Sequence, residues 1–205
     1  MKAQWLQQRG ADHLILVFGG WALGAAPFAH LKGAADVLLL SDYQSLDFDW
    51  KALPAYGRRS LIAYSFGVAA AGHALAQIPL DFDRKVAVCG SLYPADDQLG
   101  IPVERVHQTA DNLTETSLRQ FARRAGSSLP EEHDIAALIA ELRAVMARGP
   151  APDLGFERIW LGRNDRIFPP EALAAAWQDQ AEQVRWLETG HTPFAAFGDW
   201  LELLS

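Results

Sequence analysis

Three residues in this sequence have the types and the order needed for acyl transfer through a serine nucleophile. The first, Ser65, lies in the stretch "AYSFG", with Ala63 two positions before it and Gly67 two positions after it. Small residues at these positions are typical of the tight strand-to-helix turn that exposes a nucleophilic serine, usually written G-x-S-x-G. Alanine replaces the first glycine here, and serines between small residues also cap ordinary helices. The stretch alone therefore leaves both roles open.

A serine hydroxyl needs a base that accepts its proton and an acid that orients this base. Asp165 in "RNDRIFPP" and His191 in "TGHTPF" follow Ser65 in the order found in α/β hydrolases. Each comes directly after an apolar run, at the carboxyl edge where open parallel sheets bind ligands. Asp165 is also a common turn former, and His191 could cap the last helix or lie exposed in a loop. The combination of three residue types, their order and their placement favours a catalytic triad.

Acyl transfer also needs hydrogen-bond donors for the oxyanion. The backbone N–H of Phe66, directly after the serine, is one candidate. The second would come from the early loop "FGGWALG", in which Gly20 permits close approach of the backbone and Trp21 offers an N–H and an aromatic wall. The alternative is a tight turn with Trp21 as a core residue.

The surrounding pattern predicts a mostly parallel sheet with helices on both faces, an α/β-hydrolase fold in one domain over residues 1–205. Branched, apolar runs predict strands at 13–19, 35–41, 60–65, 84–90, 156–162 and 183–188. Helices are expected at 66–77, 169–181 and 193–204. The segment 105–149 has no strand pattern. Two stretches in it, "ETSLRQFARRAG" and "EEHDIAALIAELRAVMARG", show apolar residues at helical spacing, which predicts a helical cap inserted after the fourth of these strands.

Composition narrows the classes of protein and site. The net charge of −7 argues against nonspecific binding to nucleic acid. The apolar stretch near the N-terminus is broken by glycines and a proline, so we expect a buried strand and no signal peptide or membrane segment. The single cysteine, Cys89, excludes a disulfide framework and a cysteine-rich zinc site, and indicates the cytoplasm. No histidine shares a spacing with acidic residues that would predict a metal site.

Several stretches together resemble a known family. "FGGW", "AYSFGV", "GSLYPADDQLGIP", "FARRAG", "GRNDRIFP" and "HTPF" are similar to motifs of the BioG-type pimeloyl-[acyl-carrier protein] methyl ester esterases of biotin synthesis. The resemblance implies a cytoplasmic serine esterase that needs no metal or organic cofactor. It would remove the methyl group from pimeloyl methyl ester on acyl carrier protein. Ser65 would be the nucleophile, His191 the base and Asp165 its orienting acid.

An acidic carrier protein would give the arginines of the predicted cap a function. Arg119, Arg123 and Arg124 are spaced so that we expect a helix to gather them on one side. They would bind carboxylates or the phosphate of the carrier's phosphopantetheine arm. The alternative is a solvated helix face balanced by nearby glutamates.

Other interpretations stay open at this point. Phe121, Leu138 and Leu142 would line an acyl channel or, more simply, pack in the core. The enzyme could instead hydrolyse free short-chain esters or thioesters. The chain could also be a catalytically silent α/β fold that binds a carrier protein.

Overall fold

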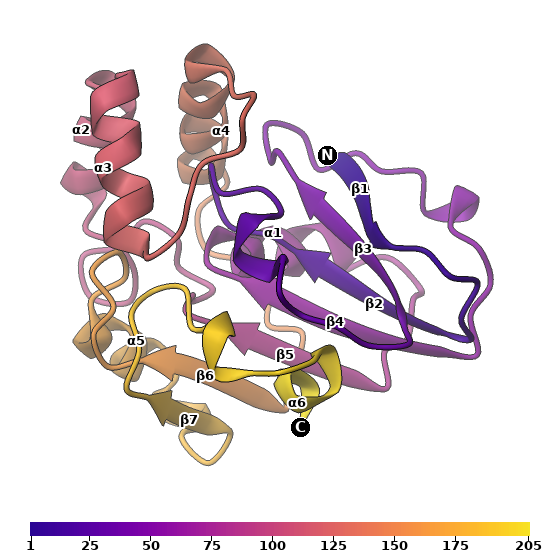
Figure 1. Cartoon of the computed structure of the whole chain (residues 1–205). Coiled ribbons are helices and arrows are strands. Elements are labelled where there is room, and N and C mark those ends of the chain that lie inside the picture. The colour runs from indigo at the N-terminus through magenta and orange to yellow at the C-terminus, as the bar shows by residue number, and fades with distance from the viewer.

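A seven-stranded sheet forms the centre of the computed structural model, which covers residues 1–205 (Figure 1). The strands in chain order are β1 (Lys2–Gln7), β2 (His13–Phe18), β3 (Asp36–Ser41), β4 (Arg58–Tyr64), β5 (Arg84–Val88), β6 (Arg158–Gly162) and β7 (Val184–Leu187). Their order across the sheet is β1-β3-β2-β4-β5-β6-β7. All neighbouring strands run parallel except β1, which pairs antiparallel with β3. The predicted α/β architecture with a mostly parallel sheet is confirmed.

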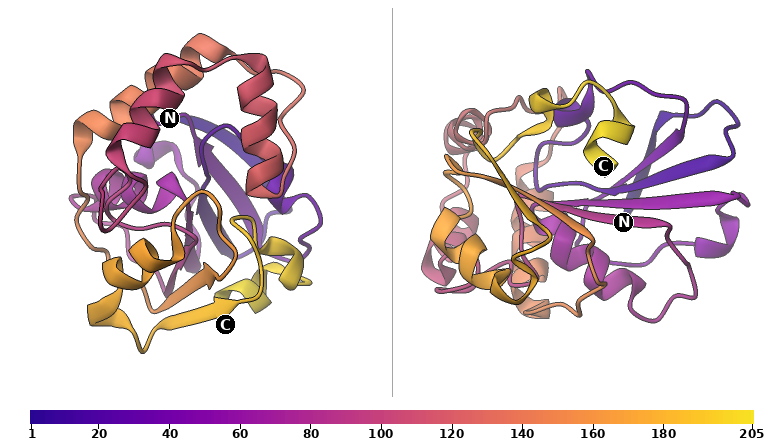
Figure 2. Two further views of the ribbon diagram at one scale, coloured as in Figure 1. Left: turned by 90° about the vertical axis from the view of Figure 1, so that its left-hand side faces the viewer. Right: turned by 90° about the horizontal axis from the view of Figure 1, so that it is seen from below.

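The central strands contain apolar runs that are buried because helices cover both faces of the sheet. Leu14 to Phe18 of β2 are completely buried, as are Leu61 to Tyr64 of β4. Helix α1 (Phe66–Leu75) lies on one face, and α6 (Trp200–Leu204) lies on the other (Figure 2). A strand buried on both faces needs no alternation of polar and apolar residues. The continuous apolar runs that result are the pattern from which these strands were predicted.

The edge strand β1 was not predicted. It pairs only with β3, and its residues are exposed or half-buried. An edge strand covered on one side can carry polar residues, and "KAQWLQ" has three of them. The sequence therefore lacks the apolar run that marks the other strands.

The predicted helix over 193–204 is wrong as one element. It divides into a 3-10 helix, Phe194–Ala196, and α6. Asp199 separates them by capping α6: its carboxylate accepts hydrogen bonds from the N–H groups of Leu201 and Glu202. The predicted helix over 169–181 is likewise shorter, because α5 (Pro170–Ala176) is followed by a separate 3-10 turn.

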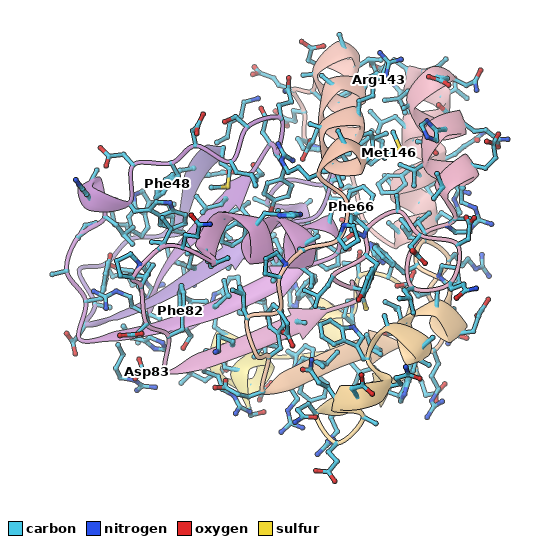
Figure 3. All side chains as sticks on the ribbon, turned by 180° about the vertical axis from the view of Figure 1, so that it is seen from behind. Phe48, Phe66, Phe82, Asp83, Arg143 and Met146 are labelled. Atoms are coloured by element: carbon cyan, nitrogen blue, oxygen red, sulfur yellow. The ribbon has the colours of Figure 1, made fainter.

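A helical cap is inserted between β5 and β6, the fourth and fifth of the predicted strands. It contains α2 (Val103–Asp111), α3 (Glu115–Ala125) and α4 (Ile135–Arg148). The three helices stand over the carboxyl edge of the sheet (Figures 1 and 2). Figure 3 shows Phe66 at this end of the sheet, and Phe82 and Asp83 at the opposite end.

Only two of the three cap helices were recognisable from their patterns. Helix α2 buries just Val106 and Ala110, so its apolar stripe is short. Helices α3 and α4 have clear starts, where the side chains of Thr114 and Asp134 accept hydrogen bonds from the first turns. No helix of the protein is both long enough and apolar enough to cross a membrane.

Candidate active site

Ser65 occupies a strained turn between β4 and α1. Its φ is +58°, which is uncommon for a residue other than glycine and is concentrated at functional sites. Gly67 is required on the far side of the turn, since a Cβ there would collide with the carbonyl oxygen of Phe18. Gly90, after β5, is equally restricted because a Cβ would strike the carbonyl oxygen of Ser65. The small residues around this serine thus serve close backbone packing, as the motif predicts.

The structure brings Ser65, His191 and Asp165 into one chain of hydrogen bonds. His191 Nε2 lies 3.0 Å from Ser65 Oγ, and His191 Nδ1 lies 2.8 Å from Asp165 Oδ2. A carboxylate only accepts, so Nδ1 carries the proton and leaves Nε2 of the neutral ring free to accept the hydroxyl proton. The three residues are 5%, 1% and 6% exposed, respectively. This geometry would allow Ser65 to act as a nucleophile, His191 as its base and Asp165 as the orienting acid.

The second oxygen of Asp165 fixes the carboxylate in place. Oδ1 accepts hydrogen bonds from the backbone N–H groups of Ile167 at 2.7 Å and Phe168 at 3.0 Å. The turn that the sequence suggested for Asp165 is therefore real, but it leaves Oδ2 free for the histidine. Asp165 can therefore form the turn and orient His191 at the same time.

The loops after β6 and β7 are held together by backbone contacts. Asn164 N donates to the carbonyl of Thr189 at 3.0 Å. Gly162, the last residue of β6, leaves room for this approach, because a Cβ would collide with the carbonyl oxygen of Gly190. Parallel pairing of β6 with β7 thus carries Asp165 and His191 to the same edge. Strand β5, which lies between β4 and β6 in the sheet, leads into the cap.

The candidate oxyanion donors lie beside the serine. Neither the backbone N–H of Trp21 nor that of Phe66 donates a hydrogen bond within the protein, and the N–H of the first helical residue has no intrahelical acceptor. A Cβ on Gly20 would lie 3.2 Å from Ser65 Cβ, so the backbone of this loop lies directly beside the serine side chain. Two unpaired N–H groups near a buried serine can stabilise an anionic oxygen.

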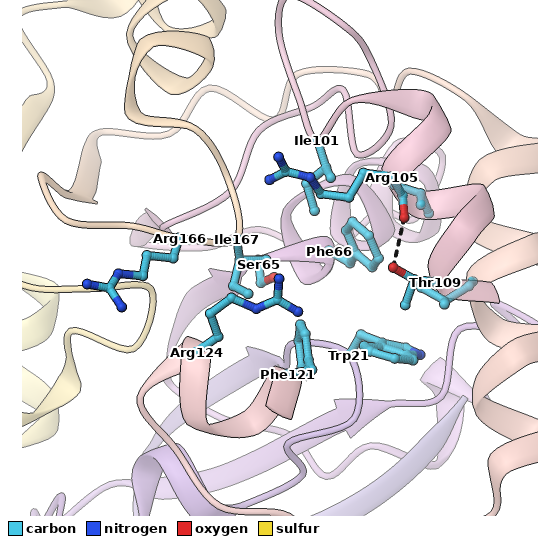
Figure 4. A pocket seen from close by; sticks show the side chains of 12 residues that line it. Trp21, Ser65, Phe66, Ile101, Arg105, Thr109, Phe121, Arg124, Arg166 and Ile167 are labelled. Atoms are coloured by element: carbon cyan, nitrogen blue, oxygen red, sulfur yellow. Dashed lines mark hydrogen bonds between the residues drawn. The ribbon is translucent and has the colours of Figure 1, made fainter. Parts of the chain in front are cut away.

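A pocket opens at Ser65 beneath the cap and, with its mouth, holds about 560 Å³ (Figure 4). Its lining combines apolar side chains with three arginines and contains no acidic residue. The lining residues are Trp21, Ser65, Phe66, Ile101, Arg105, Val106, Thr109, Phe121, Arg124, Leu142, Arg166 and Ile167. We call this the Ser65 pocket. It suits an apolar chain that ends near a polar or anionic group.

The predicted arginine cluster is divided between two hollows. Arg124 lines the Ser65 pocket, whereas Arg119 and Arg123 line a separate cavity on the other side of α3. We call this the outer hollow; His133 also lines it. The expectation that all three share one side is wrong, because neighbouring helical residues point about 100° apart.

Two arginines of the Ser65 pocket were missed from the sequence. Arg105 lies on α2, the cap helix without a recognisable pattern, and Arg166 directly follows Asp165. Arg166 was visible in "NDRIFP", so its position next to the predicted acid was the available signal. Arg105, Arg124 and Arg166 are exposed, and none of their guanidinium groups forms an ion pair.

The apolar residues proposed for an acyl channel are also divided. Phe121 and Leu142 line the Ser65 pocket, but Leu138 does not. Its carbonyl oxygen instead accepts a hydrogen bond from Trp21 Nε1 at 3.1 Å, and Trp21 packs edge-on against Phe121 at 4.8 Å. Trp21 thus joins the loop after β2 to two helices of the cap.

Cys89 is a buried core residue and does not line the Ser65 pocket. Burial raises the pKa of its thiol well above the ordinary range. The structure contains no group of three or more histidine, cysteine, aspartate or glutamate side chains arranged to hold a metal ion.

Comparison with known proteins decides the family. The model of the family described as "Pimeloyl-ACP methyl esterase BioG" matches residues 1–203. This chain belongs to the BioG family. The resemblance found in the sequence is therefore confirmed, and BioG proteins are carboxylic ester hydrolases by family description.

A crystal structure supports the same assignment. BioG from Haemophilus influenzae superimposes with a TM-score of 0.87, is 30% identical, and both chains are covered completely. A lipase-esterase related protein from Clostridium acetobutylicum, at 12% identity and a TM-score of 0.62 over 93% of this chain and 91% of its own, shares the α/β-hydrolase fold.

A curated relative from Bacteroides fragilis is named malonyl-[acyl-carrier protein] O-methyltransferase and is 31% identical over 190 residues. The match covers 86% of this chain but only 39% of that protein. The chain therefore spans about two fifths of the length of this relative.

Proposed function

We propose that this protein hydrolyses the methyl ester of pimeloyl-[acyl-carrier protein] methyl ester, giving pimeloyl-[acyl-carrier protein] and methanol in biotin synthesis. The carrying observation is the Ser65–His191–Asp165 hydrogen-bond chain at the base of an apolar, arginine-lined pocket in a BioG-family chain. The acyl carrier protein would be the partner, which makes the cytoplasm the working compartment.

The first half of the reaction forms an acyl-enzyme. His191 Nε2 accepts the Ser65 proton while Ser65 Oγ attacks the carbonyl carbon of the methyl ester. Asp165 holds the ring so that Nε2 faces the serine and stabilises the imidazolium that forms. The N–H groups of Trp21 and Phe66 would donate to the developing oxyanion. Collapse of the tetrahedral intermediate breaks the bond to methoxide, which leaves as methanol with the proton from His191.

The second half restores the serine. Water enters the site vacated by methanol, and His191 Nε2 takes one of its protons as the oxygen attacks the acyl carbon. The bond between this carbon and Ser65 Oγ then breaks, and the proton returns to Ser65. The product is a carboxylate on the carrier-bound chain. The chemistry of this cycle is supplied by residues of the chain itself.

The charges around the cap support a substrate on a carrier. Arg105, Arg124 and Arg166 have no acidic partner within the Ser65 pocket, in a protein whose net charge is −7. Guanidinium groups left without partners are suited to carbonyl, carboxylate or phosphate oxygens. We place the chain of the substrate along the apolar wall and its polar arm at these arginines. Arg119 and Arg123 in the outer hollow would then contact the acidic carrier itself.

The Bacteroides fragilis relative gives independent support for this substrate. Its name assigns it methylation of an acyl group on acyl carrier protein, and about two fifths of it is similar to this chain. A region similar to an esterase within a protein named for carrier-bound methyl transfer is consistent with a carrier-bound methyl ester as the substrate.

The test compares two substrates with one purified protein. We expect release of methanol and a 14-dalton loss from pimeloyl methyl ester on acyl carrier protein, as replacement of CH₃ by H requires, with kcat/KM at least about tenfold higher than for the free dimethyl ester. Equal kcat/KM for both would instead support hydrolysis of free esters. Binding of the carrier without hydrolysis of either would support the silent fold. Rescue of a biotin-requiring strain that lacks its methyl esterase tests the role in the cell.

A further inference from the structure

We propose that Tyr64 and Thr192 form a positioning pair that holds Ser65 and His191 in reactive geometry. Tyr64 immediately precedes Ser65, and Thr192 immediately follows His191. Their hydroxyl oxygens, Tyr64 Oη and Thr192 Oγ1, lie 3.0 Å apart, in hydrogen-bonding contact. The neighbours of the nucleophile and the base are thus bonded to each other across 128 positions of sequence. The inference rests on the proposed acyl transfer by Ser65.

The ring of Tyr64 also limits the motion of His191. The hydrogen bonds at Nδ1 and Nε2 fix the ends of the imidazole but leave it free to rock about the line joining them. Tyr64 lies against the ring, with centroids 5.2 Å apart, and Phe168 stacks with it at 6.0 Å and 15° between the planes. Contacts from these two rings oppose this rocking. A misplacement of about 1 Å in a catalytic group can cost about 100-fold in rate.

Tyr64 supports the oxyanion loop as well. A Cβ on Gly20 would lie 2.7 Å from Tyr64 Cε1, so the backbone of this loop rests directly on the tyrosine ring. One side chain therefore contacts the loop that carries Trp21, pairs with the residue after the base and is bonded in sequence to the nucleophile. Tyr64 is fully buried and does not line the Ser65 pocket. It acts through other residues and does not touch the substrate.

The hydroxyl is the part of Tyr64 that a core aromatic would not need. Phenylalanine would fill the same space without burying a polar atom, and a buried hydroxyl is costly unless it is bonded. Thr192 supplies that bond, which sets the backbone after His191 relative to the end of β4. The pair thus links two loops whose separation decides the Ser65–His191 distance.

The experiment removes each hydroxyl and then both. Tyr64→Phe and Thr192→Val should each lower kcat about tenfold with KM unchanged, because a lost hydrogen bond of this kind corresponds to about that factor. The double variant should be no worse than the poorer single variant, and Thr192→Ser should keep wild-type kcat. Tyr56→Phe is the matched control: its hydroxyl bonds Asp36 at 3.0 Å, and Asp36 begins β3, far from the carboxyl edge. It should change stability and leave kcat unchanged.

Two readouts separate this inference from the proposed function. Hydrolysis of pimeloyl methyl ester on carrier protein tests both, whereas the rate at which a fluorophosphonate labels Ser65 tests nucleophile activation alone. Wild-type labelling without hydrolysis would refute the substrate and leave the pair testable. Unchanged kcat and labelling rate in folded Tyr64→Phe, or additive losses in the double variant, would overturn the pair. A melting temperature that falls without loss of kcat would assign Tyr64 to the core alone.

Discussion

The carboxyl edge of the sheet and the cap meet at the Ser65 pocket and carry opposite kinds of residue there and beside it. At the sheet edge, Ser65, Asp165 and His191 are almost fully buried and joined by hydrogen bonds. On the cap, Arg105 and Arg124 are exposed and their guanidinium groups have no protein partner. The fixed residues are suited to chemistry, which needs constant distances, and the free ones are suited to a ligand that supplies the missing partners.

The difference follows from how each region is held. The sheet edge is positioned by parallel strand pairing and by glycines that permit close backbone contact. The cap is bonded to the loops that follow β2 and β3, through Trp21 to Leu138 and Tyr43 to Glu141. We therefore expect substitutions at the edge to change the chemical step and substitutions on the cap to change recognition.

The largest expected effect tests the edge. Ser65→Ala should lower kcat by at least about 10⁴-fold, because the only other hydroxyl lining the Ser65 pocket, that of Thr109, donates to the carbonyl of Arg105 and is not bonded to His191. Methanol release from the carrier-bound ester measures it, and carrier affinity measured in parallel should stay at the wild-type value. Wild-type turnover in a purified, folded Ser65→Ala protein would refute the assignment of the nucleophile.

Glu141, which links the cap to the loop after β3, should make the stability of the protein depend on pH. Glu141, on α4, is buried, and its Oε1 accepts a hydrogen bond from Tyr43 N at 3.0 Å. Burial, with a smaller contribution from Asp42, raises the pKa of this carboxyl from its ordinary 4.5 to about 7. The folded state then binds more protons than the unfolded state between these values. The free energy of unfolding should therefore fall as pH rises through this window.

Glu141→Gln isolates this effect, since the amide oxygen can still accept from Tyr43. Between pH 4.5 and pH 8 the wild type should lose about 3 kcal/mol of its free energy of unfolding relative to the variant, because only the wild type has a carboxyl to ionise here. Urea unfolding at several pH values measures it. The exposed Glu132 provides the control substitution, Glu132→Gln, which should give a difference that is flat with pH. A flat difference for Glu141→Gln would mean that this carboxylate ionises freely in the folded protein.

The contrast between sheet edge and cap also explains which site residues could be placed from the sequence. Chain order alone carried Ser65, Asp165 and His191 to one edge, because the residue after each parallel strand must lie there. It could not assign a side to each cap arginine, since that depends on the rotation of α3 about its axis. Leu118, Ala122 and Ala125 form the buried stripe that sets this rotation.

Contacts between residues distant in the sequence could not be predicted, for a different reason. Tyr64 lies next to Ser65 in "AYSFG", but nothing in the sequence pattern links its hydroxyl to Thr192. Strand β1 was missed because it has no apolar run, and helix α2 was missed because it is short and begins after Pro102 without a capping side chain.

Arginines in the Ser65 pocket and in the outer hollow can be tested separately for binding of the substrate arm and of the carrier protein. Arg124→Met should lower kcat/KM for the carrier-bound ester about tenfold by removing a charged hydrogen bond near the substrate arm. Arg123→Met should instead weaken binding of the carrier severalfold, by an amount that shrinks at high salt, as expected for exposed charges. Steady-state kinetics and carrier titration at two salt concentrations measure both.

Arg143→Met is the control for both substitutions, because Arg143 pairs with Asp111 and lines neither hollow. If all three variants behave alike, the cap arginines contribute only general charge, and the proposed division between substrate arm and carrier fails.

The smallest expected effect tests whether the sheet edge depends on its contact with the cap. Trp21→Phe keeps an aromatic ring against Phe121 but removes the hydrogen bond from Nε1 to Leu138. If this bond sets the oxyanion loop against the cap, kcat should fall about threefold for carrier-bound and free esters alike, with a loss of about 1 kcal/mol in the free energy of unfolding.

Trp160→Phe is the matched control for this last effect. It removes the same kind of bond, from Trp160 Nε1 to the carbonyl of Leu203 at 2.9 Å, but at a site away from the Ser65 pocket. The control should lose similar stability and keep full kcat, since no oxyanion donor depends on it. Equal kcat in both variants would show that the sheet edge holds its oxyanion loop without help from the cap. The cap would then contribute to recognition alone.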